Sequence, residues 1–224
     1  MARSAARWVA ATLAASLAAT GVAGCGGHRP RPAALRIERA DLVMVAHTLT
    51  QLRAPVAAET AAARGAWPSL TGGLPRHARP VLRMRVAAAA RLAAALRLPA
   101  AVLVEGFLTG PAASLAGMLK SYVRLSQRGW GYLAQALAPP AGTSGGRVAA
   151  RFLRANAALY IYCVYDGHYN LSLVGKTLLS AYRQLGGAPA FGGLLTQGEV
   201  EALARFYSIP TVRLQPHPAP RVVV

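Results

Sequence analysis

The sequence predicts an all-α fold, a single-domain bundle of five or six helices with a kinked first helix. Apolar residues recur at alternating spacings of three and four over several long stretches, the pattern of helices that bury one face. Stretches rich in glycine and proline separate these segments, and no strand-like alternation reaches a useful length. With 224 residues, the chain is long enough for one domain with a buried core.

The first helix is expected from about residue 37, and it directs one acidic residue toward the core. Its apolar stripe consists of Leu42, Val45, Leu49, Leu52 and Val56. Pro55 should kink the helix, because its ring clashes with the carbonyl group one turn back. Beyond the kink the same stripe reaches Glu59. A carboxyl group on a core-facing stripe must be paired, protonated or functional.

A second helix is expected over residues 81–98, and it offers a partner for that acid. Its apolar side carries Leu82, Val86, Leu92 and Leu96. Arg85 projects among these residues, so it is a candidate partner for Glu59. The apolar run 86–104 is not expected to cross a membrane, because each of two arginines near its middle would cost roughly 2.5 to 3.5 kcal/mol there. Glu105, between Val104 and Gly106, is another acid in apolar surroundings.

A third helix should begin at Thr109-Gly110-Pro111, where the missing N–H of proline does no harm. Its stripe consists of Leu115, Met118, Tyr122 and Leu125. Continuing the stripe leads to Gly129, next to Trp130. A glycine at that place predicts either the close approach of another helix or a bend.

A fourth helix, from residue 147 to about 165, places arginine and tyrosine on one face: Arg147, Arg151, Arg154, Tyr162 and Tyr165. These residue types are favoured at recognition surfaces, because they combine large contact area with adaptable polar ends. We therefore predict a binding surface here. The alternative is a solvated arginine face whose tyrosines pack under a neighbouring helix.

Asp166-Gly167 is expected to end the fourth helix, and a fifth helix follows. The inner stripe of the fifth helix is Leu171, Val174, Leu178, Tyr182 and Leu185. A short last helix should begin at Thr196-Gln197-Gly198-Glu199, which has the capping-box pattern. Residues 208–224, with several prolines, are expected to form an extended tail.

The first 24 residues have the layout of a secretory signal, because Arg3 and Arg7 precede an apolar run that ends in small residues. The run is too short to span a membrane. Val22-Ala23-Gly24-Cys25 resembles the lipobox of bacterial lipoproteins. The alternative is an ordinary secretory signal in which Cys25 is merely nearby.

The lipobox resemblance implies that residues 1–24 are removed and that Cys25 carries a thioether-linked diacylglycerol with palmitate-type acyl chains. The membrane is then a partner through this lipid, and the protein lies on the extracytoplasmic face of the cell membrane. Residues 25–34 would be the lipidated linker and residues 35–207 the helical domain. With Cys25 acylated, Cys163 is the only remaining thiol, so no intramolecular disulfide can form.

The chain is strongly basic, with 25 Lys and Arg against 7 Asp and Glu and a formal net charge of +18. Removal of Arg3 and Arg7 with the signal lowers this charge by two, to +16. Such a surplus attracts anionic lipid or cell-wall polymer, and a protein partner also fits it. Nucleic acid is not expected as the partner of an exported protein. The alternative is that the excess of arginine and alanine reflects the coding bias of a GC-rich genome.

The candidate catalytic residues are Glu59, Asp166 and His168. An aspartate two residues from a histidine can orient it as a base, or both can ligate a metal. Alternatively, Asp166 accepts backbone N–H groups in a turn while His168 packs or caps a helix. Two ligands do not make a metal site, and the sequence lacks the HExxH, GxSxG, Walker A and Rossmann patterns.

We therefore expect neither a metal nor a cofactor. The first hypothesis is a non-enzymatic binding module for a protein partner or an anionic envelope component. The second is a small-molecule or metal-binding protein, or a hydrolase, that uses Glu59, Asp166 and His168.

Overall fold

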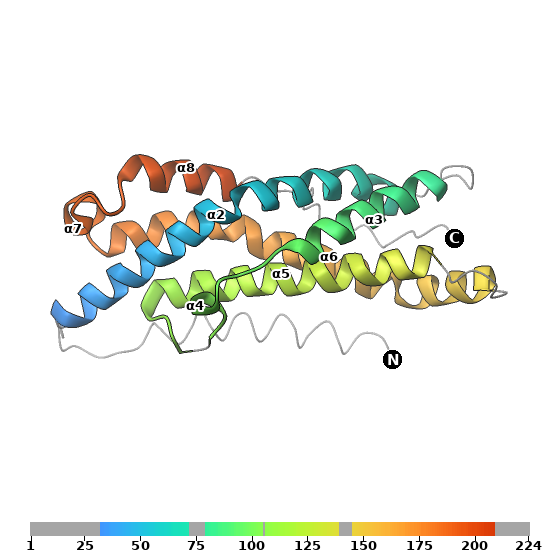
Figure 1. Cartoon of the computed structure of the whole chain (residues 1–224), viewed down its shortest axis with the longest axis horizontal. Helices are drawn as coiled ribbons and strands as arrows, with labels where there is room; N and C mark the ends of the chain where they lie inside the picture. The colour runs from blue at the N-terminus through green and yellow to red at the C-terminus, as the bar shows by residue number, and fades with distance from the viewer. Residues whose placement is uncertain (1–31, 72–78, 105, 139–144, 209–224) are drawn as a thin grey trace. The chain divides into compact units, whose positions relative to one another are not determined.

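The computed structural model describes residues 32–71, 79–104, 106–138 and 145–208, and all regular structure in them is helical (Figure 1). Five longer helices are α2 (Pro32–Thr71), α3 (Arg79–Ala95), α5 (Gly110–Leu137), α6 (Gly145–Gln184) and α8 (Gln197–Ser208). Two short helices are α4 (Ala100–Leu103) and α7 (Gly187–Phe191). The predicted all-α class is thus confirmed for the described residues.

The helices pack as a bundle in which α6 is central. α5 packs along α6, α8 packs on the later part of α6, and α3 packs on α5. α2 joins them through side chains, because the Tyr207 hydroxyl on α8 donates a hydrogen bond of 2.6 Å to the Leu49 carbonyl oxygen. Among the described residues, no helix combines the length and the hydropathy needed to cross a membrane.

α2 carries the predicted inner stripe and the predicted proline. Every predicted stripe residue is buried: Leu42, Val45, Leu49, Leu52 and Val56. Pro55 lies inside the helix, and Figure 1 shows α2 changing direction along its length. The helix begins at Pro32, so the last three residues of the predicted linker 25–34 are helical instead. Proline is well tolerated in the first turn, where its missing N–H has no helical partner.

α6 is one continuous helix, so the predicted end at Asp166-Gly167 is wrong. Gly167 faces α5, and a Cβ atom there would lie 3.0 Å from the Ser126 hydroxyl oxygen and 3.3 Å from the Leu125 Cβ. The glycine therefore serves close packing between two helices, although an Asp-Gly pair also favours turns.

Two more glycines bring helices close together. A Cβ atom on Gly129 of α5 would lie 2.7 Å from the Val164 Cγ2 of α6. Of the two predicted roles of Gly129, the structure therefore shows the close approach of another helix and not a bend. A Cβ atom on Gly175 of α6 would collide with the Ala204 carbonyl oxygen of α8. The contacts of α6 with α5 and α8 thus depend on positions without a side chain.

The ends of two helices follow the predicted local chemistry. At the start of α8, the Glu199 Oε2 accepts a hydrogen bond of 2.8 Å from the Thr196 backbone N–H, and Thr196 Oγ1 accepts one of 3.3 Å from the Glu199 N–H. These reciprocal bonds confirm the capping box. Thr196 also lowers the pKa of Glu199, because its hydroxyl and amide donate to the carboxylate. α5 has Thr109 as its N-cap and a proline in its first turn, as predicted.

The buried apolar residues form two clusters that meet in the middle of the bundle. The first cluster takes residues from the early part of α2 and α5, the late part of α6, and α8. The second takes residues from the late part of α2 and α5, the early part of α6, and α3. On α2 the change from one cluster to the other falls between Val56 and Ala63, and on α6 between Val164 and Leu171.

We predict that Gly175→Ala destabilises the protein although glycine is a poor helix former. The new methyl group would overlap α8, and overpacking of this kind costs typically about 1 to 3 kcal/mol. The matched control is Gly65→Ala on α2, where a Cβ atom would meet nothing within 4 Å. That exchange should stabilise the helix by up to about 1 kcal/mol. Urea unfolding followed by circular dichroism measures both, and equal effects of the two variants would contradict the packing of α8 on α6.

Candidate functional site

A cluster of polar side chains lies where the two apolar clusters meet, and Glu59 is its centre. The Tyr122 hydroxyl donates a hydrogen bond of 2.6 Å to Glu59 Oε2. The indole N–H of Trp130 donates one of 2.9 Å to Glu59 Oε1, and His168 Nε2 lies 3.2 Å from the same oxygen. α2, α5 and α6 thus each contribute to one network, called here the Glu59 network.

The Glu59 network is closed to solvent. The exposed fraction is 0% for Glu59 and 1% for His168, and Tyr122 and Trp130 are both 0% exposed. Burial raises the pKa of Tyr122 well above its usual value, and the neighbouring Glu59 raises it further. The phenol therefore keeps its proton and acts as a hydrogen-bond donor. Because a buried carboxyl group needs such donors, the network stabilises an acid that would otherwise be costly to bury.

Two buried hydroxyl groups adjoin the network. Thr60 follows Glu59 on α2, and Ser126 lies one helical turn from both Tyr122 and Trp130 on α5. Thr60 Oγ1 and Ser126 Oγ have no hydrogen-bond partner among the described residues. The polar layer between the two cores therefore extends beyond the four residues of the network.

The structure separates the three candidate catalytic residues. Glu59 and His168 meet in the network, whereas Asp166 is exposed. Since α6 is continuous, two residues advance roughly 200° around its axis, which places Asp166 and His168 on different sides. Among the described residues, no group of three or more His, Cys, Asp or Glu side chains could hold a metal ion.

The predicted pairing of Arg85 with Glu59 is wrong. Arg85 is exposed, and its Nη1 donates a hydrogen bond of 2.9 Å to the Gly65 carbonyl oxygen on α2. An arginine can reach solvent along its flexible stem, which avoids the cost of burying a second charge beside Glu59. Glu105 lies outside the described residues.

Tyr122 and Trp130 are the members of the network that were not among the predicted site residues. Their spacing contains the signal, because Tyr122, Ser126 and Trp130 follow one another at intervals of four on the buried face of α5. A buried tyrosine or tryptophan usually finds a hydrogen-bond partner for its polar end. Two of them on one core-facing stripe therefore point to a polar group on the opposing helix.

Of the predicted arginine-tyrosine surface, the structure describes only the two tyrosine side chains. Tyr162 is 37% exposed, whereas Tyr165 is half-buried and stacks on Trp67 of α2 with 6.4 Å between ring centroids. The side chains of Arg147, Arg151 and Arg154 lie outside the described residues, so the surface stays a prediction. The predicted lipid attachment site, Cys25, also lies outside them.

Cys163, by contrast, is described. It is free and half-buried, and burial raises the pKa of its thiol.

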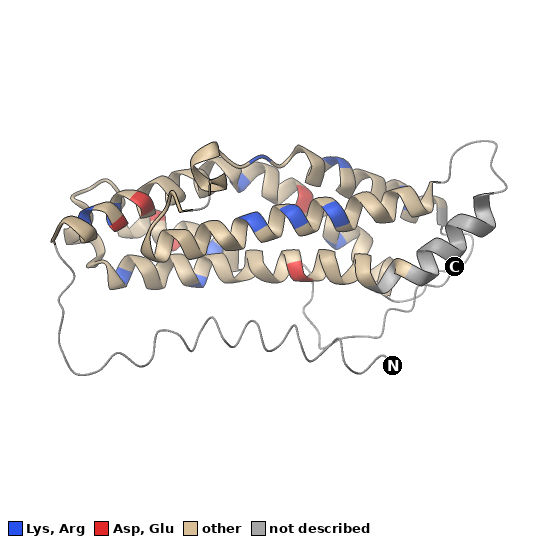
Figure 2. Cartoon of the chain, turned by 90° about the horizontal axis from the view of Figure 1, so that it is seen from below, with Lys and Arg blue, Asp and Glu red and all other residues tan. Residues whose placement is uncertain are grey.

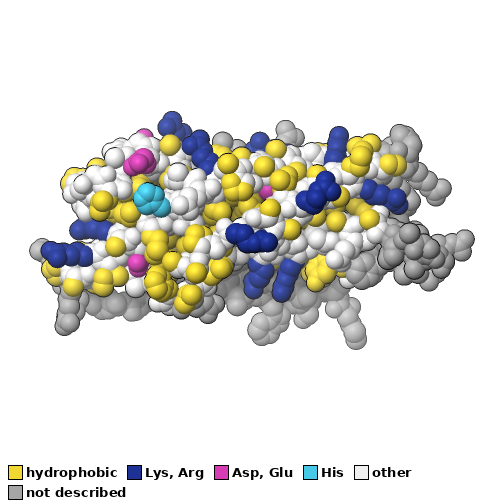
Figure 3. Space-filling view, viewed as in Figure 1, with side chains coloured by type: hydrophobic (Ala, Val, Ile, Leu, Met, Phe, Trp, Pro, Cys, Tyr) yellow, Lys and Arg dark blue, Asp and Glu magenta, His cyan; other side chains and the backbone are white. Residues whose placement is uncertain are grey.

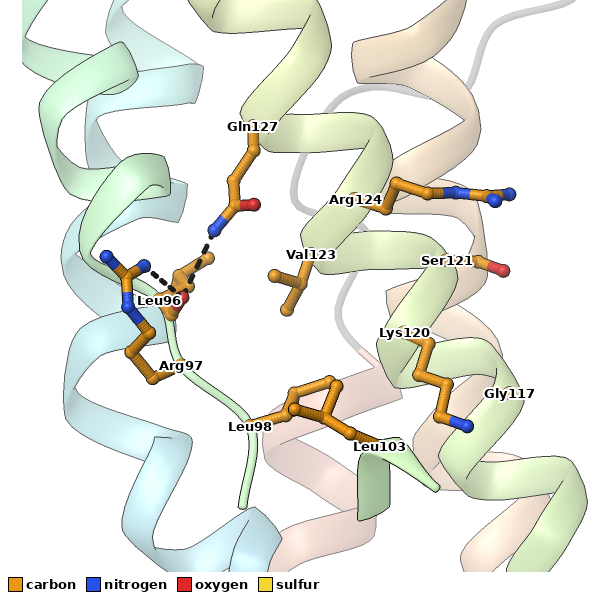
Figure 4. A pocket seen from close by; sticks show the side chains of 10 residues that line it. All are labelled: Leu96, Arg97, Leu98, Leu103, Gly117, Lys120, Ser121, Val123, Arg124 and Gln127. Atoms are coloured by element: carbon orange, nitrogen blue, oxygen red, sulfur yellow. Dashed lines mark hydrogen bonds between the residues drawn. The ribbon is translucent and has the colours of Figure 1, made fainter. Parts of the chain in front are cut away.

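A second site lies on the outside of the bundle, as a pocket of about 570 Å³ between α5 and the segment from α3 to α4 (Figure 4). It is lined by Leu96, Arg97, Leu98, Leu103, Gly117, Lys120, Ser121, Val123, Arg124 and Gln127. Figure 4 shows Leu98, Leu103 and Val123 turned toward the space, whereas the Arg97 guanidinium group lies beside Leu96 and the Arg124 side chain extends away from the space. We call it the basic pocket, because none of its described lining residues is acidic.

One wall of the basic pocket is fixed by hydrogen bonds to the end of α3. The Leu96 carbonyl oxygen accepts a hydrogen bond of 3.1 Å from the Gln127 side-chain amide and one of 2.9 Å from Arg97 Nη1. Arg97 Nη1 also bonds the Ala94 carbonyl oxygen. The Gln127 bond ties the end of α3 to α5, and the three bonds together satisfy carbonyl groups that the helix end leaves without partners.

Neither a model of a known protein family, nor a curated protein, nor a solved structure matches the chain.

We predict that Tyr122→Phe destabilises the fold more than Tyr207→Phe does. Both tyrosines are buried and donate a hydrogen bond of 2.6 Å, the first to a carboxyl group and the second to a backbone carbonyl. Loss of the Tyr122 hydroxyl leaves a buried carboxyl oxygen without its donor, which costs about 1 to 3 kcal/mol, whereas an ordinary hydrogen bond contributes about 0.5 to 1.5 kcal/mol. Chemical unfolding at neutral pH gives both losses; a larger loss for Tyr207→Phe would contradict the dependence of the buried Glu59 carboxyl group on its donors.

Proposed function

We propose that the chain is a lipid-anchored extracytoplasmic protein whose helical domain binds an anionic component of the cell envelope. The observation that carries the binding part is the basic pocket, whose described lining includes Arg97, Lys120 and Arg124 and no acidic residue. The anchoring part rests on the lipobox-like sequence that ends at Cys25.

The charges around the basic pocket favour an anionic ligand. Figure 2 shows Lys and Arg positions distributed along the described helices, with few Asp and Glu positions between them. On the face seen in Figure 3, basic side chains project from a surface that also carries hydrophobic groups. Because Glu59 is buried in its network, it does little to offset these charges at the surface. A cleft of one charge sign raises the local concentration of oppositely charged ligands.

A lipid on Cys25 would hold this basic domain beside a membrane. Each buried CH2 group of an acyl chain contributes about 0.8 kcal/mol, so a diacylated cysteine gives stable attachment. The domain would then act on components that lie within reach of the membrane surface.

The positions of Glu59, Asp166 and His168 do not favour the enzymatic alternative. Glu59 and His168 are enclosed by the bundle, and Asp166 lies apart from them on the outside of α6. Groups that work on a substrate must come within hydrogen-bond reach of it. The Glu59 network is better suited to positioning three helices than to chemistry.

The lipid anchor predicts that Cys25 is the acylated residue. In a bacterial host that makes lipoproteins, the wild-type protein should incorporate labelled palmitate and Cys25→Ser should not. Cys163→Ser is the matched control, since it removes the other cysteine of the chain and should keep the label. Label retained by Cys25→Ser would rule out this anchor, as would an unlabelled wild-type protein.

The basic pocket predicts salt-sensitive binding of a soluble polyanion. A protein that starts at Gly26 keeps every residue of both core clusters, so it should fold without the lipid. Its affinity for inorganic polyphosphate should fall by roughly tenfold or more in the triple variant Arg97→Gln, Lys120→Gln, Arg124→Gln, because each cation contributes up to about 1 kcal/mol. Binding should also weaken as salt screens the charges.

The control for this experiment is the triple variant Lys176→Gln, Arg183→Gln, Arg205→Gln. It removes one lysine and two arginines, as the first variant does, from exposed positions on α6 and α8. Titration calorimetry compares the two at equal net charge. If both variants lose the same affinity, binding follows the net charge and not the pocket.

A further inference from the structure

The segment 102–109, which begins in the last turn of α4, is fixed at both ends, and its described residues expose apolar side chains in between. Val102 and Leu108 are buried in the first core cluster, with exposed fractions of 0% and 7%. The backbone N–H of Thr109 and its hydroxyl donate hydrogen bonds of 2.8 and 2.7 Å to Asp41 Oδ2 on α2. The segment is therefore held in place by packing and by hydrogen bonds.

Three large apolar side chains on this segment face away from the core. The exposed fractions are 52% for Leu103, 55% for Val104 and 58% for Phe107. A scattered exposed apolar residue is ordinary, but several within five positions of the chain indicate an interaction site. Since Val102 and Leu108 already occupy the places toward the core, closer packing of the segment would not bury the other three.

These apolar side chains adjoin the basic pocket. Leu103 lines the pocket together with Arg97, Lys120 and Arg124. Apolar groups beside cations are what peripheral proteins present to anionic bilayers, because the apolar groups enter the boundary of the acyl region while the cations stay among the headgroups. Lys and Arg can also extend their charged ends toward phosphate groups along flexible stems.

The segment also lies at the end of the bundle where α2 begins. Asp41 bonds Thr109, and a Cβ atom on Gly110 would lie 3.0 Å from Glu38 Cδ. Glu38 and Asp41 belong to the first ten residues of α2. Along the chain, this is the end closest to Cys25, the proposed attachment point of the lipid.

We propose that this edge, formed by Leu103, Val104 and Phe107 together with Arg97, Lys120 and Arg124, docks on a membrane of anionic phospholipid. The inference rests on the proposed function and identifies its anionic component as the phospholipid of the membrane. Apolar side chains enter the bilayer boundary, and the three cations contact lipid phosphate groups. A polar wall polymer would leave Leu103 and Phe107 in water, so it accounts for the cations alone.

The test uses the protein that starts at Gly26, so that no acyl chain contributes to binding. Co-sedimentation compares vesicles of phosphatidylglycerol with vesicles of phosphatidylcholine. The double variant Val104→Ser, Phe107→Ser should reduce partitioning onto phosphatidylglycerol by roughly tenfold or more, because it removes two inserted apolar side chains that do not line the pocket. The control Met84→Ser, Leu194→Ser removes apolar side chains that are 65% and 74% exposed elsewhere, and it should leave partitioning unchanged.

Polyphosphate binding separates this inference from the proposed function. The double variant should bind polyphosphate as the wild type does, because Val104 and Phe107 do not line the basic pocket. If the double variant also partitions onto phosphatidylglycerol as the wild type does, the proposed docking on the membrane is overturned. The same holds if the wild type binds phosphatidylcholine equally well. In both cases the anion-binding function stands. If the wild type binds neither polyphosphate nor phosphatidylglycerol, both proposals fail. Circular dichroism of each variant shows whether a loss of binding comes from unfolding.

Discussion

The burial of one carboxyl group is the constraint on which the rest of this bundle depends. Glu59 is 0% exposed, and the groups that stabilise it come from α5 and α6. A shift of any of the three helices by one turn would leave the acid without donors in an apolar core, which is strongly unfavourable. The network therefore fixes how α2, α5 and α6 are aligned along their lengths. The two apolar clusters specify this alignment less strictly, because aliphatic side chains can pack against one another in more than one way.

Close helix packing is the second condition for this network. Gly129 and Gly167 let α5 and α6 approach on either side of the polar layer, and Gly175 lets α8 approach α6. A larger side chain at these places would separate the helices and lengthen the hydrogen bonds that end on Glu59. The polar layer and the glycines thus support each other, since the glycines bring the donors near and the network selects one alignment.

The outside of the bundle carries the basic pocket and the exposed apolar side chains on which the two proposals rest. The acids of the described residues lie at the start of α2, within the Glu59 network, on α6 and at the start of α8, and none lines the basic pocket. Arg97 and Gln127 bond the end of α3, which shapes the pocket, and the bonds of Thr109 to Asp41 hold the segment that carries Phe107. A rigid interior thus holds in place the backbone positions that carry these cations and apolar groups, which would lower the entropy cost of the proposed binding.

The sequence by itself determined most of the helical segments, most of their inner stripes, the capping box of α8 and the burial of Glu59, because each follows from the local period of 3.6 residues or from a short motif. Only the tertiary structure decided what Glu59 meets. Its partners lie 63, 71 and 109 residues away along the sequence, and packing among helices chooses them. The same packing keeps α6 continuous through Gly167, brings His168 inside and leaves Asp166 outside. Local patterns define which face of a helix is buried, but they carry no information about which distant residue will lie opposite.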